Sequence, residues 1–298
     1  MKDYLLQTIK EKLGDKYNLA PNNLALLKLN TPSSGLGTYG KVIFLVFKHN
    51  NVEPLLCVKT VRKVADNIVI TKGFSKLQSL HQIIKNSPYV QMFPVPLLID
   101  NDASGIAYSI ESACPGRRPS QADLPYILES YNQYQSFLAK DHLSYQENFD
   151  LYIKDLLVSL SLLESDILDI YDYYQHSIKT SSDIKIALLP QHGDITLDNM
   201  FINEAGTHIF DCDRFGDIRL AGFDVFHFLH RILKNDNLAL FKRYLLEHLA
   251  KIDNQSKLSP DLLFAYLLHE IFLKREVLPD KLNMDLIKRE FSVLKLFL

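Results

Sequence analysis

The sequence of 298 residues has no tryptophan, only three cysteines and no long apolar run. Without tryptophan, an aromatic cage for a quaternary ammonium group lacks the side chain that binds such cations best. Cys57, Cys114 and Cys212 are odd in number and far apart, so they predict neither a disulfide framework nor a CxxC metal site. A reducing cytoplasm is therefore the expected location. The most apolar run, Val42 to Phe47, is too short to span a bilayer, so no membrane partner is expected.

Charge is almost balanced, with 33 Lys and Arg against 35 Asp and Glu, which gives a formal net charge of −2. Proteins that bind nucleic acid usually carry a basic face, so nucleic acid is not an expected partner. The first residues have charges spaced among the apolar ones and no signal-peptide core, which indicates a soluble protein that is not exported. No pattern in the sequence specifies an oligomeric state.

The first third of the chain is rich in strand-like runs. Before these runs, Leu5, Ile9 and Leu13 recur every four residues, which predicts a short amphipathic helix that contains them. The expected strands are Leu24 to Leu29, Lys41 to Phe47, Leu55 to Val61 and Ile106 to Glu111, with one helix from Ile70 to Ile84. This order indicates a small, mostly antiparallel sheet carrying one helix.

Beyond Pro119 the patterns become helical. Long helices are expected over Pro125 to Leu138, Gln146 to His176 and in several pieces from Phe223 to Leu298. We therefore predict an α+β protein with a β-rich N-terminal lobe over residues 1–114 and a larger helical lobe over 115–298.

Gly35, Gly37 and Gly40 form a GxGxxG pattern. A dinucleotide-binding loop of this type opens a helix, whereas here the strong strand formers of residues 42–47 follow. A glycine loop between two strands is typical of the flap that covers ATP phosphates in kinases. A glycine-rich hairpin without a ligand is the alternative.

Lys59 lies within an apolar strand, where an unpaired buried ammonium group would be costly. In the arrangement found in kinases this lysine neutralises the α- and β-phosphates of ATP. The alternative is an edge-strand lysine that faces solvent.

The segment from His192 to Asp211 is the most informative part of the chain. Two strand-like runs flank a turn, and a three-residue loop over 204–206 would place Asn199 opposite Asp211. Opposed residues share a face, so an amide oxygen and a carboxylate would together favour a hard cation such as Mg²⁺. Asp194, five positions before Asn199, is then a candidate to accept the proton of a substrate hydroxyl. A polar loop followed by an ordinary hairpin is the alternative.

These residues resemble the catalytic motif of aminoglycoside phosphotransferases and of the related choline, homoserine and methylthioribose kinases. The resemblance rests on His192-Gly-Asp194-x4-Asn199 followed by an apolar strand, with Asp211 on the returning strand. It implies a bilobal protein-kinase-like fold and an ATP- and Mg²⁺-dependent transfer to a hydroxyl group of a small molecule. In that family His192 would support the catalytic loop.

Two further segments are similar to the same family. Ser109 to Gly116 is similar to its hinge, which implies nucleotide contacts at Glu111, Ser112 and Cys114. Asp224, in Gly222 to Phe226, matches the helix aspartate that steadies the catalytic loop.

One family feature is missing. The helix after Lys59 normally supplies a glutamate to that lysine, yet no glutamate occurs between Glu53 and Glu111. Either Lys59 has no such partner or Gln78 replaces it through a hydrogen bond. This departure keeps a nucleotide-binding pseudokinase or scaffold open as an alternative, and a protein kinase is a less favoured one. The acceptor region, about Gln121 to Lys179, has no recognisable motif.

Several polar residues receive a simpler interpretation. His227 and His230 share a helix face but lack HExxH spacing, so we interpret them as packing residues. Asp198, Asp213 and Asp217 are either an acidic approach for a cationic substrate or solvated surface.

Overall fold

The computed structural model describes residues 2–17, 24–29, 41–146, 148–159, 164–180, 185–233, 238–253, 258–275 and 284–295. Contacts within the chain divide it into two compact units. The first comprises Met1–Pro119 and Leu197–Arg214, and the second comprises Ser120–Thr196 and Phe215–Leu298. The lobe boundary expected after residue 114 differs from this division, in which the chain also returns to the first unit for residues 197–214.

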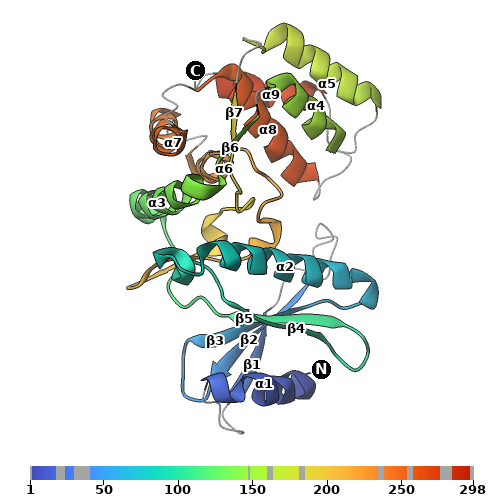
Figure 1. The fold of residues 1–298 in the computed structure, drawn as a ribbon, viewed down its shortest axis with the longest axis vertical. Helices are drawn as coiled ribbons and strands as arrows, with labels where there is room; N and C mark the ends of the chain where they lie inside the picture. The colour runs from blue at the N-terminus through green and yellow to red at the C-terminus, as the bar shows by residue number, and fades with distance from the viewer. Residues whose placement is uncertain are drawn as a thin grey trace. The chain divides into compact units, whose positions relative to one another are not determined.

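Among the described residues, the first unit contains an antiparallel sheet with the strand order β1-β2-β3-β5-β4. Its strands are β1 (Leu24–Leu29), β2 (Val42–Lys48), β3 (Pro54–Thr60), β4 (Pro96–Asn101) and β5 (Ala107–Ser112). Helix α1 (Lys2–Tyr17) lies along one face of the sheet and helix α2 (Asn67–Ile84) along the other (Figure 1).

Alternation along the strands decides which side chains meet each helix. Leu56 and Val58 of β3 point towards α1 and join its Leu5, Ile9 and Leu13 in one core cluster. Because successive residues of a strand point to opposite faces, Lys59 lies on the face that α2 covers.

The strands and α1 agree with the sequence expectations, and each of the four predicted strands is shifted by at most one residue. Strand β4 was not predicted, because Pro94 and Pro96 interrupt its pattern. Pro96 is the first residue of β4, which is an edge strand of the sheet. A missing N–H is tolerated at such a position.

A hairpin of β8 (Met200–Asn203) and β9 (Gly206–Ile209) also belongs to the first unit. Asn203 pairs with Gly206, so the loop has the two residues 204 and 205 instead of the predicted three. Arg117 pairs with Ile202 and thereby connects this hairpin to the segment that follows β5.

The shorter loop changes the predicted pairing of Asn199. The N–H of Phe210 donates to the carbonyl oxygen of Asn199 at 3.0 Å, so Asn199 lies opposite Phe210 and not opposite Asp211. A slip of one residue would send side chains to the other face of a regular ladder. However, Asp211 has left the ladder, since its φ of +63° is in the left-handed region.

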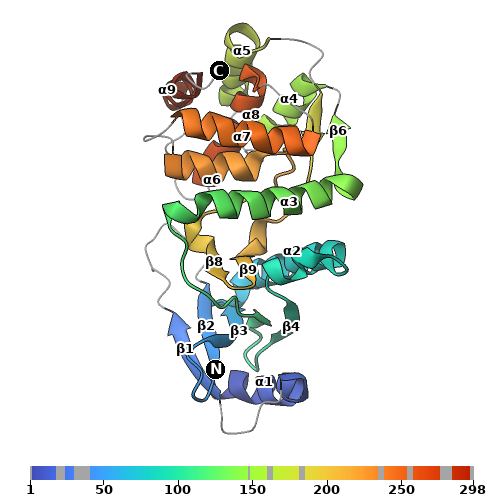
Figure 2. The ribbon, with the colours of Figure 1, turned by 90° about the vertical axis from the view of Figure 1, so that its left-hand side faces the viewer.

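The second unit is mainly helical. Its elements are α3 (Leu124–His142), β6 (Ser144–Gln146), α4 (Phe149–Ser159), α5 (Glu164–Ser177), β7 (Ile186–Leu188), α6 (Phe223–Leu233), α7 (Leu238–Asp253), α8 (Pro260–Arg275) and α9 (Met284–Lys295). Helices α3, α6 and α7 run side by side (Figure 2). The helical stretch predicted from Gln146 to His176 is not one helix: Gln146 ends β6, and two helices, α4 and α5, follow.

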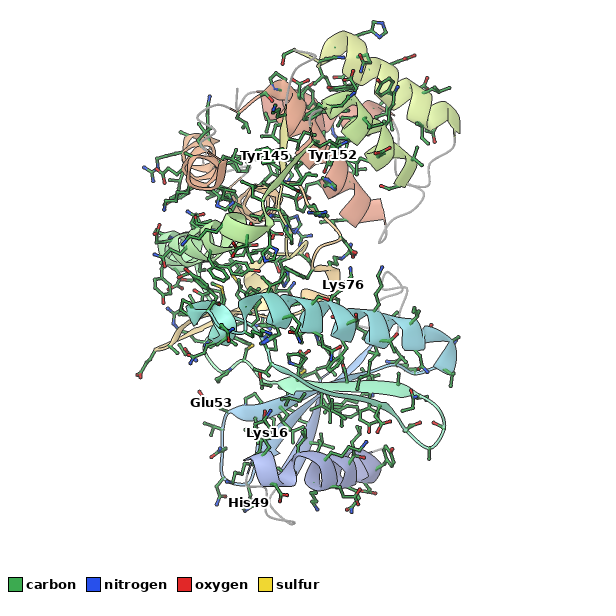
Figure 3. All side chains as sticks on the ribbon, in the orientation of Figure 1. Lys16, His49, Glu53, Lys76, Tyr145 and Tyr152 are labelled. Carbon is green, nitrogen blue, oxygen red and sulfur yellow. The ribbon has the colours of Figure 1, made fainter. Side chains whose placement is uncertain are left out.

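Helix α8 forms the centre of this unit. Its side chains from Leu262 to Ile271 are buried around the whole helix, as expected for a helix enclosed by neighbours. In α4, the hydroxyl group of Tyr152 (labelled in Figure 3) lies 2.7 Å from Nε2 of His269 in α8. Within the described residues, no helix is both long enough and apolar enough to span a bilayer.

The packing of α1 on the sheet can be tested by replacing Ile9, which is fully buried in that cluster. We expect Ile9→Ala to lower the free energy of unfolding by about 2–5 kcal/mol, because it removes apolar contacts and leaves a cavity. Urea unfolding measures this. Asp15→Ala, on the exposed side of the same helix, should change it by less than about 0.5 kcal/mol. Equal losses would contradict this packing.

Candidate functional site

Lys59 is buried and faces a carboxylate from a neighbouring strand. Its Nζ lies 3.2 Å from Oε1 of Glu111, and the two side chains are only 9% and 5% exposed. The register explains the contact, because Lys59 pairs with Ser109 and Glu111 is the diagonal neighbour on the same face. The alternative of a solvent-facing edge lysine is therefore wrong.

Two aspartates from the segment after β9 complete the surroundings of Lys59. Its Nζ lies 3.5 Å from Oδ1 of Asp211 and 3.6 Å from Oδ1 of Asp213. Lys41, just before β2, contacts Oδ2 of Asp213 and lies 3.7 Å from Oδ1 of Asp211. We call these five residues, Lys41, Lys59, Glu111, Asp211 and Asp213, the lysine–carboxylate cluster.

The charges of this cluster depend on one another. Burial alone would lower the pKa of Lys59, but Glu111, Asp213 and Asp211 outweigh it and hold that pKa well above its ordinary value. Burial raises the pKa of Glu111, and Lys59 opposes that rise. A charged Lys59 in this position requires the carboxylates around it.

These contacts answer the question of the missing helix glutamate. Gln78 is exposed, so the hypothesis that it replaces the glutamate is wrong. At Gly73 of α2, a Cβ atom would lie 2.7 Å from Oδ1 of Asp213. The carboxylate of Asp213 occupies the space that a helix side chain would need. Together with Glu111, it supplies the negative charge that the sequence of α2 lacks.

The hinge residues are partly committed to the sheet. Ser112 donates its N–H to the carbonyl oxygen of Val95 at 3.0 Å, and its hydroxyl group accepts from the N–H of Val95 at 2.8 Å. Ala113 donates to the carbonyl oxygen of Leu55 at 3.1 Å. Burial raises the pKa of the Cys114 thiol to about 12, so it is not a reactive thiolate.

Asn199 and Asp211 remain candidates for a cation, although not as a directly opposed pair. Asn199 is half-buried beside the ladder that ends at Phe210, and Asp211 follows immediately. In the part of the chain that the structure describes, no three His, Cys, Asp or Glu side chains are arranged to hold a metal ion alone. One amide and one carboxylate suit Mg²⁺, which keeps several waters and binds substrate phosphates.

In the second unit, Asp224 organises the loop that carries Asp194. The carboxylate of Asp224 is fully buried in the first turn of α6. It accepts the N–H of His192 at 2.6 Å, the N–H of Gly193 at 2.8 Å and the hydroxyl group of Tyr131. Gly193 has a φ of +87°, a conformation that a glycine adopts without strain. Asp224 thus determines the course of the backbone just before Asp194.

The side chain of Asp194 is contacted by a histidine of the same helix. Oδ1 of Asp194 lies 3.4 Å from Nε2 of His227, and Nδ1 of His227 contacts Oε1 of Glu270. Burial raises the pKa of Asp194, but the contact with His227 outweighs burial and holds this pKa at about 2. Burial lowers the pKa of His227, but Asp194 and Glu270 raise it to about 9.

The predicted residues thus fall into two groups. The lysine–carboxylate cluster and Asn199 belong to the first unit, whereas His192, Asp194 and Asp224 belong to the second. Gly35, Gly37 and Gly40 lie outside the described residues, so the glycine loop stays a prediction.

Sequence reasoning missed the charged roles of Asp213, His227 and Glu270. His227 does pack within α6, but it is also ion-paired, so its interpretation as a packing residue alone is incomplete. Glu270 had a detectable signal, since a glutamate amid the apolar residues 262–271 must have a partner.

The fold is that of small-molecule kinases, and it confirms the α+β kinase-like fold expected from the resemblance to aminoglycoside phosphotransferases. No family model and no curated protein matches the sequence. A thermostable mutant of aminoglycoside phosphotransferase APH(4)-Ia, in a ternary complex with ADP and hygromycin B, matches with a TM-score of 0.56 and 12% identity over 97% of each chain.

Two other solved structures have the same fold. The GDP and kanamycin complex of the aminoglycoside phosphotransferase APH(2")-IIIa has a TM-score of 0.53 and 13% identity, covering 98% of this chain and 97% of that chain. Amicoumacin kinase hAmiN in complex with AMP-PNP, Ca²⁺ and Ami has a TM-score of 0.51 and 13% identity, covering 98% of this chain and 94% of that chain.

A double-mutant cycle tests the buried pair of Lys59 and Glu111. We expect Lys59→Met to lower the free energy of unfolding by about 3–5 kcal/mol, because it leaves Glu111 buried without its counter-charge. Glu111→Leu should cost less, since Lys59 keeps Asp211 and Asp213. The double variant should be more stable than the sum of the single losses implies, by about 0.5–3 kcal/mol in urea unfolding. Additive losses would refute the coupling.

Proposed function

We propose that this protein is a phosphotransferase that moves the γ-phosphoryl group of ATP to a hydroxyl group of a small molecule. The observation that carries the proposal is the Asp194 loop: Asp224 binds its backbone, and the Asp194 side chain is 33% exposed with a pKa held at about 2. A positioned carboxylate beside a substrate hydroxyl is the group that this chemistry needs, because phosphoryl transfer depends mainly on positioning and charge neutralisation.

The nucleotide is proposed to bind to the first unit. In this proposal Lys59 neutralises the α- and β-phosphates, and Gly35, Gly37 and Gly40 supply the predicted phosphate-binding loop. Among the hinge residues, the N–H groups of Ser112 and Ala113 are already bound to the sheet. We therefore assign the adenine contact to the backbone of Cys114, with Glu111 and Ser112 supporting the strand end.

The charge of the lysine–carboxylate cluster supports a divalent cation. Two ammonium groups face three carboxylates, so the cluster has a net charge of −1 before any phosphate arrives. A nucleotide would therefore meet repulsion from Asp211 and Asp213 unless a cation lay between them. Asn199 and Asp211 offer oxygen ligands of the kind that Mg²⁺ prefers, and when bound the cation would offset the charge of the phosphates.

In the proposed reaction, one phosphorus–oxygen bond forms and one breaks. The substrate hydroxyl oxygen forms a bond to the γ-phosphorus, the bond from that phosphorus to the β-phosphate oxygen breaks, and ADP leaves. The hydroxyl proton passes to the carboxylate of Asp194 and then to water.

A small hydroxyl compound, such as a sugar, an amino alcohol or an aminoglycoside, is the proposed acceptor. Solved structures of the same fold hold hygromycin B or kanamycin together with a nucleotide. The pseudokinase alternative arose from the missing helix glutamate, and Glu111 with Asp213 weakens it because Lys59 is fully ion-paired without that residue. Three free thiols support the proposed cytoplasmic location.

Turnover against a panel of hydroxyl compounds tests the proposal. With Mg²⁺ and ATP we expect phosphorylation of at least one acceptor, and Asp194→Asn should lower kcat by about 10²–10⁴-fold because the proton acceptor is lost. Asp198→Asn is the matched control: it makes the same change nearby at a side chain that is 86% exposed, and kcat should stay within about twofold. Full activity of Asp194→Asn would overturn the role of Asp194.

Nucleotide binding should depend on the divalent cation. We expect calorimetry to show that removing Mg²⁺ with EDTA weakens binding of a non-hydrolysable ATP analogue at least tenfold, about 1.4 kcal/mol, because the carboxylates then repel the phosphates. Asp211→Asn should reduce this dependence, and Asp198→Asn should preserve it. Equally tight binding with and without Mg²⁺ would contradict the proposed cation site.

A further inference from the structure

Helix α6 contacts the Asp194 loop at two points. Asp224, in its first turn, binds the backbone N–H groups of His192 and Gly193. His227, three residues further on, reaches the side chain of Asp194. Residues three apart on a helix lie on one face, so the same face holds both the backbone and the carboxylate of this loop.

The ring of His227 is also contacted on the side away from Asp194. Its ring is fully buried, stacks on Phe223 with centroids 5.7 Å apart, and contacts Glu270 of α8 through Nδ1. A carboxylate at Nδ1 determines which way the ring is oriented and directs Nε2 towards Asp194. The three side chains form a row, carboxylate–imidazole–carboxylate, that ends at the partly exposed Asp194.

A neighbouring histidine shows how strongly burial acts on an imidazole in this part of the fold. His269 is also buried, and burial lowers its pKa to about 3 although Glu270 opposes that shift. Burial also lowers the pKa of His227, but Asp194 and Glu270 raise it to about 9. The other charged or titratable neighbours are Arg231, which opposes protonation of His227, and His192.

We propose that His227, held by Glu270, is a positioning residue for Asp194: it orients the carboxylate of Asp194 and keeps it ionised. The proposal rests on the function proposed above. It assigns His227 no proton-transfer step, because an imidazole that already carries its second proton has no free nitrogen to accept another.

This arrangement makes Asp194 a weak base and a well-oriented hydrogen-bond acceptor. A strong general base has a pKa close to the working pH, and a carboxylate paired with an imidazolium does not. In a loose phosphoryl-transfer transition state little proton transfer is required, so orientation of the hydroxyl oxygen contributes more than basicity. His227 therefore favours positioning at the expense of basicity.

The test compares wild type with His227→Gln, whose amide can still donate to Asp194 but has no charge. We expect the ¹³C carboxyl signal of Asp194, assigned by its loss in Asp194→Asn, to stay constant between pH 4 and pH 8 in wild type. In His227→Gln it should titrate within this range, because burial remains and the imidazolium is gone. The acid limb of the pH profile of kcat should shift to higher pH together with the Asp194 titration. We also expect kcat to fall about 10–100-fold while the KM for ATP stays unchanged.

The pH dependence of stability should differ between wild type and His227→Gln. The raised pKa of His227 means that its pairing stabilises the fold fully below pH 6.5 and that this contribution is lost as the pH rises through about 9. The lowered pKa of Asp194 means that its contribution is present above about pH 3.8 and is lost as the pH falls through about 2. In His227→Gln, the loss of stability between pH 7 and pH 10 should be smaller than in wild type.

Two further variants separate the possible outcomes. His230→Gln changes a buried histidine of the same helix that stacks on Phe226, and kcat and the Asp194 signal should both stay as in wild type. Glu270→Gln should lower the titration midpoint of His227 and give a smaller loss of kcat. It serves as the second variant if His227→Gln fails to fold.

Two results would overturn the inference: an Asp194 signal that titrates between pH 4 and pH 8 in wild type, or an unchanged signal and kcat in both His227→Gln and Glu270→Gln. The NMR titration needs no substrate. If no compound of the panel is phosphorylated, the proposed function fails while the pairing of Asp194 with His227 is still decided. If turnover is found and the variants match wild type, the inference alone fails.

Discussion

The need to neutralise a buried ammonium group determines much of the first unit. Lys59 lies on the face of β3 that α2 covers. It is surrounded by carboxylates from two separate segments, Glu111 at the end of β5 and the aspartates after β9. The hairpin of residues 200–209 follows in sequence after more than seventy residues of the second unit, yet it ends beside this lysine. A glycine on α2 leaves room for Asp213. The sheet, the hairpin and α2 thus all contribute to the surroundings of the Lys59 ammonium group.

The second unit contains a buried group of the opposite charge, a carboxylate instead of an ammonium group. Asp224 is a fully buried carboxylate, and it is satisfied by two backbone N–H groups and a tyrosine hydroxyl group. Hydrogen bonds to a charged acceptor are among the strongest in proteins, so this side chain limits the loop to one course. His227 of α6 and Glu270 of α8 add a buried charge pair next to it. Burial of charge is affordable here because every charged group has a partner of opposite sign or several donors.

The sequence allowed prediction of those features that depend on local patterns. Strands of alternating or continuous apolar residues were placed to within one residue, and the spacing of Asp194, Asn199 and Asp211 led to the family fold that the structure confirms. The predicted hairpin register was wrong, because the sequence between the two strands is compatible with a two-residue loop and with a three-residue loop. Only the pairing of Asn203 with Gly206 distinguishes them.

What sequence reasoning missed depends on which strands and helices are neighbours. Glu111 becomes the partner of Lys59 only once β3 pairs with β5, and nothing in the sequence separates that pairing from β3 with β4. His227 was interpreted from its own helix, whereas its charged contacts are with a loop thirty-three residues earlier and a helix forty-three residues later. Glu270 could have been detected from the sequence, because it is a glutamate among the apolar residues 262–271.

The source of the carboxylate beside Lys59 has a mechanical consequence. Where a helix supplies the glutamate, as in protein kinases, a shift of that helix makes or breaks the ion pair and thereby controls activity. Here Lys59 and Glu111 lie on paired strands of one sheet, so their contact persists for as long as β3 and β5 stay hydrogen-bonded. A displacement of α2 would leave this pair intact. The orientation of Lys59 is therefore set by strands of the same sheet and not by α2.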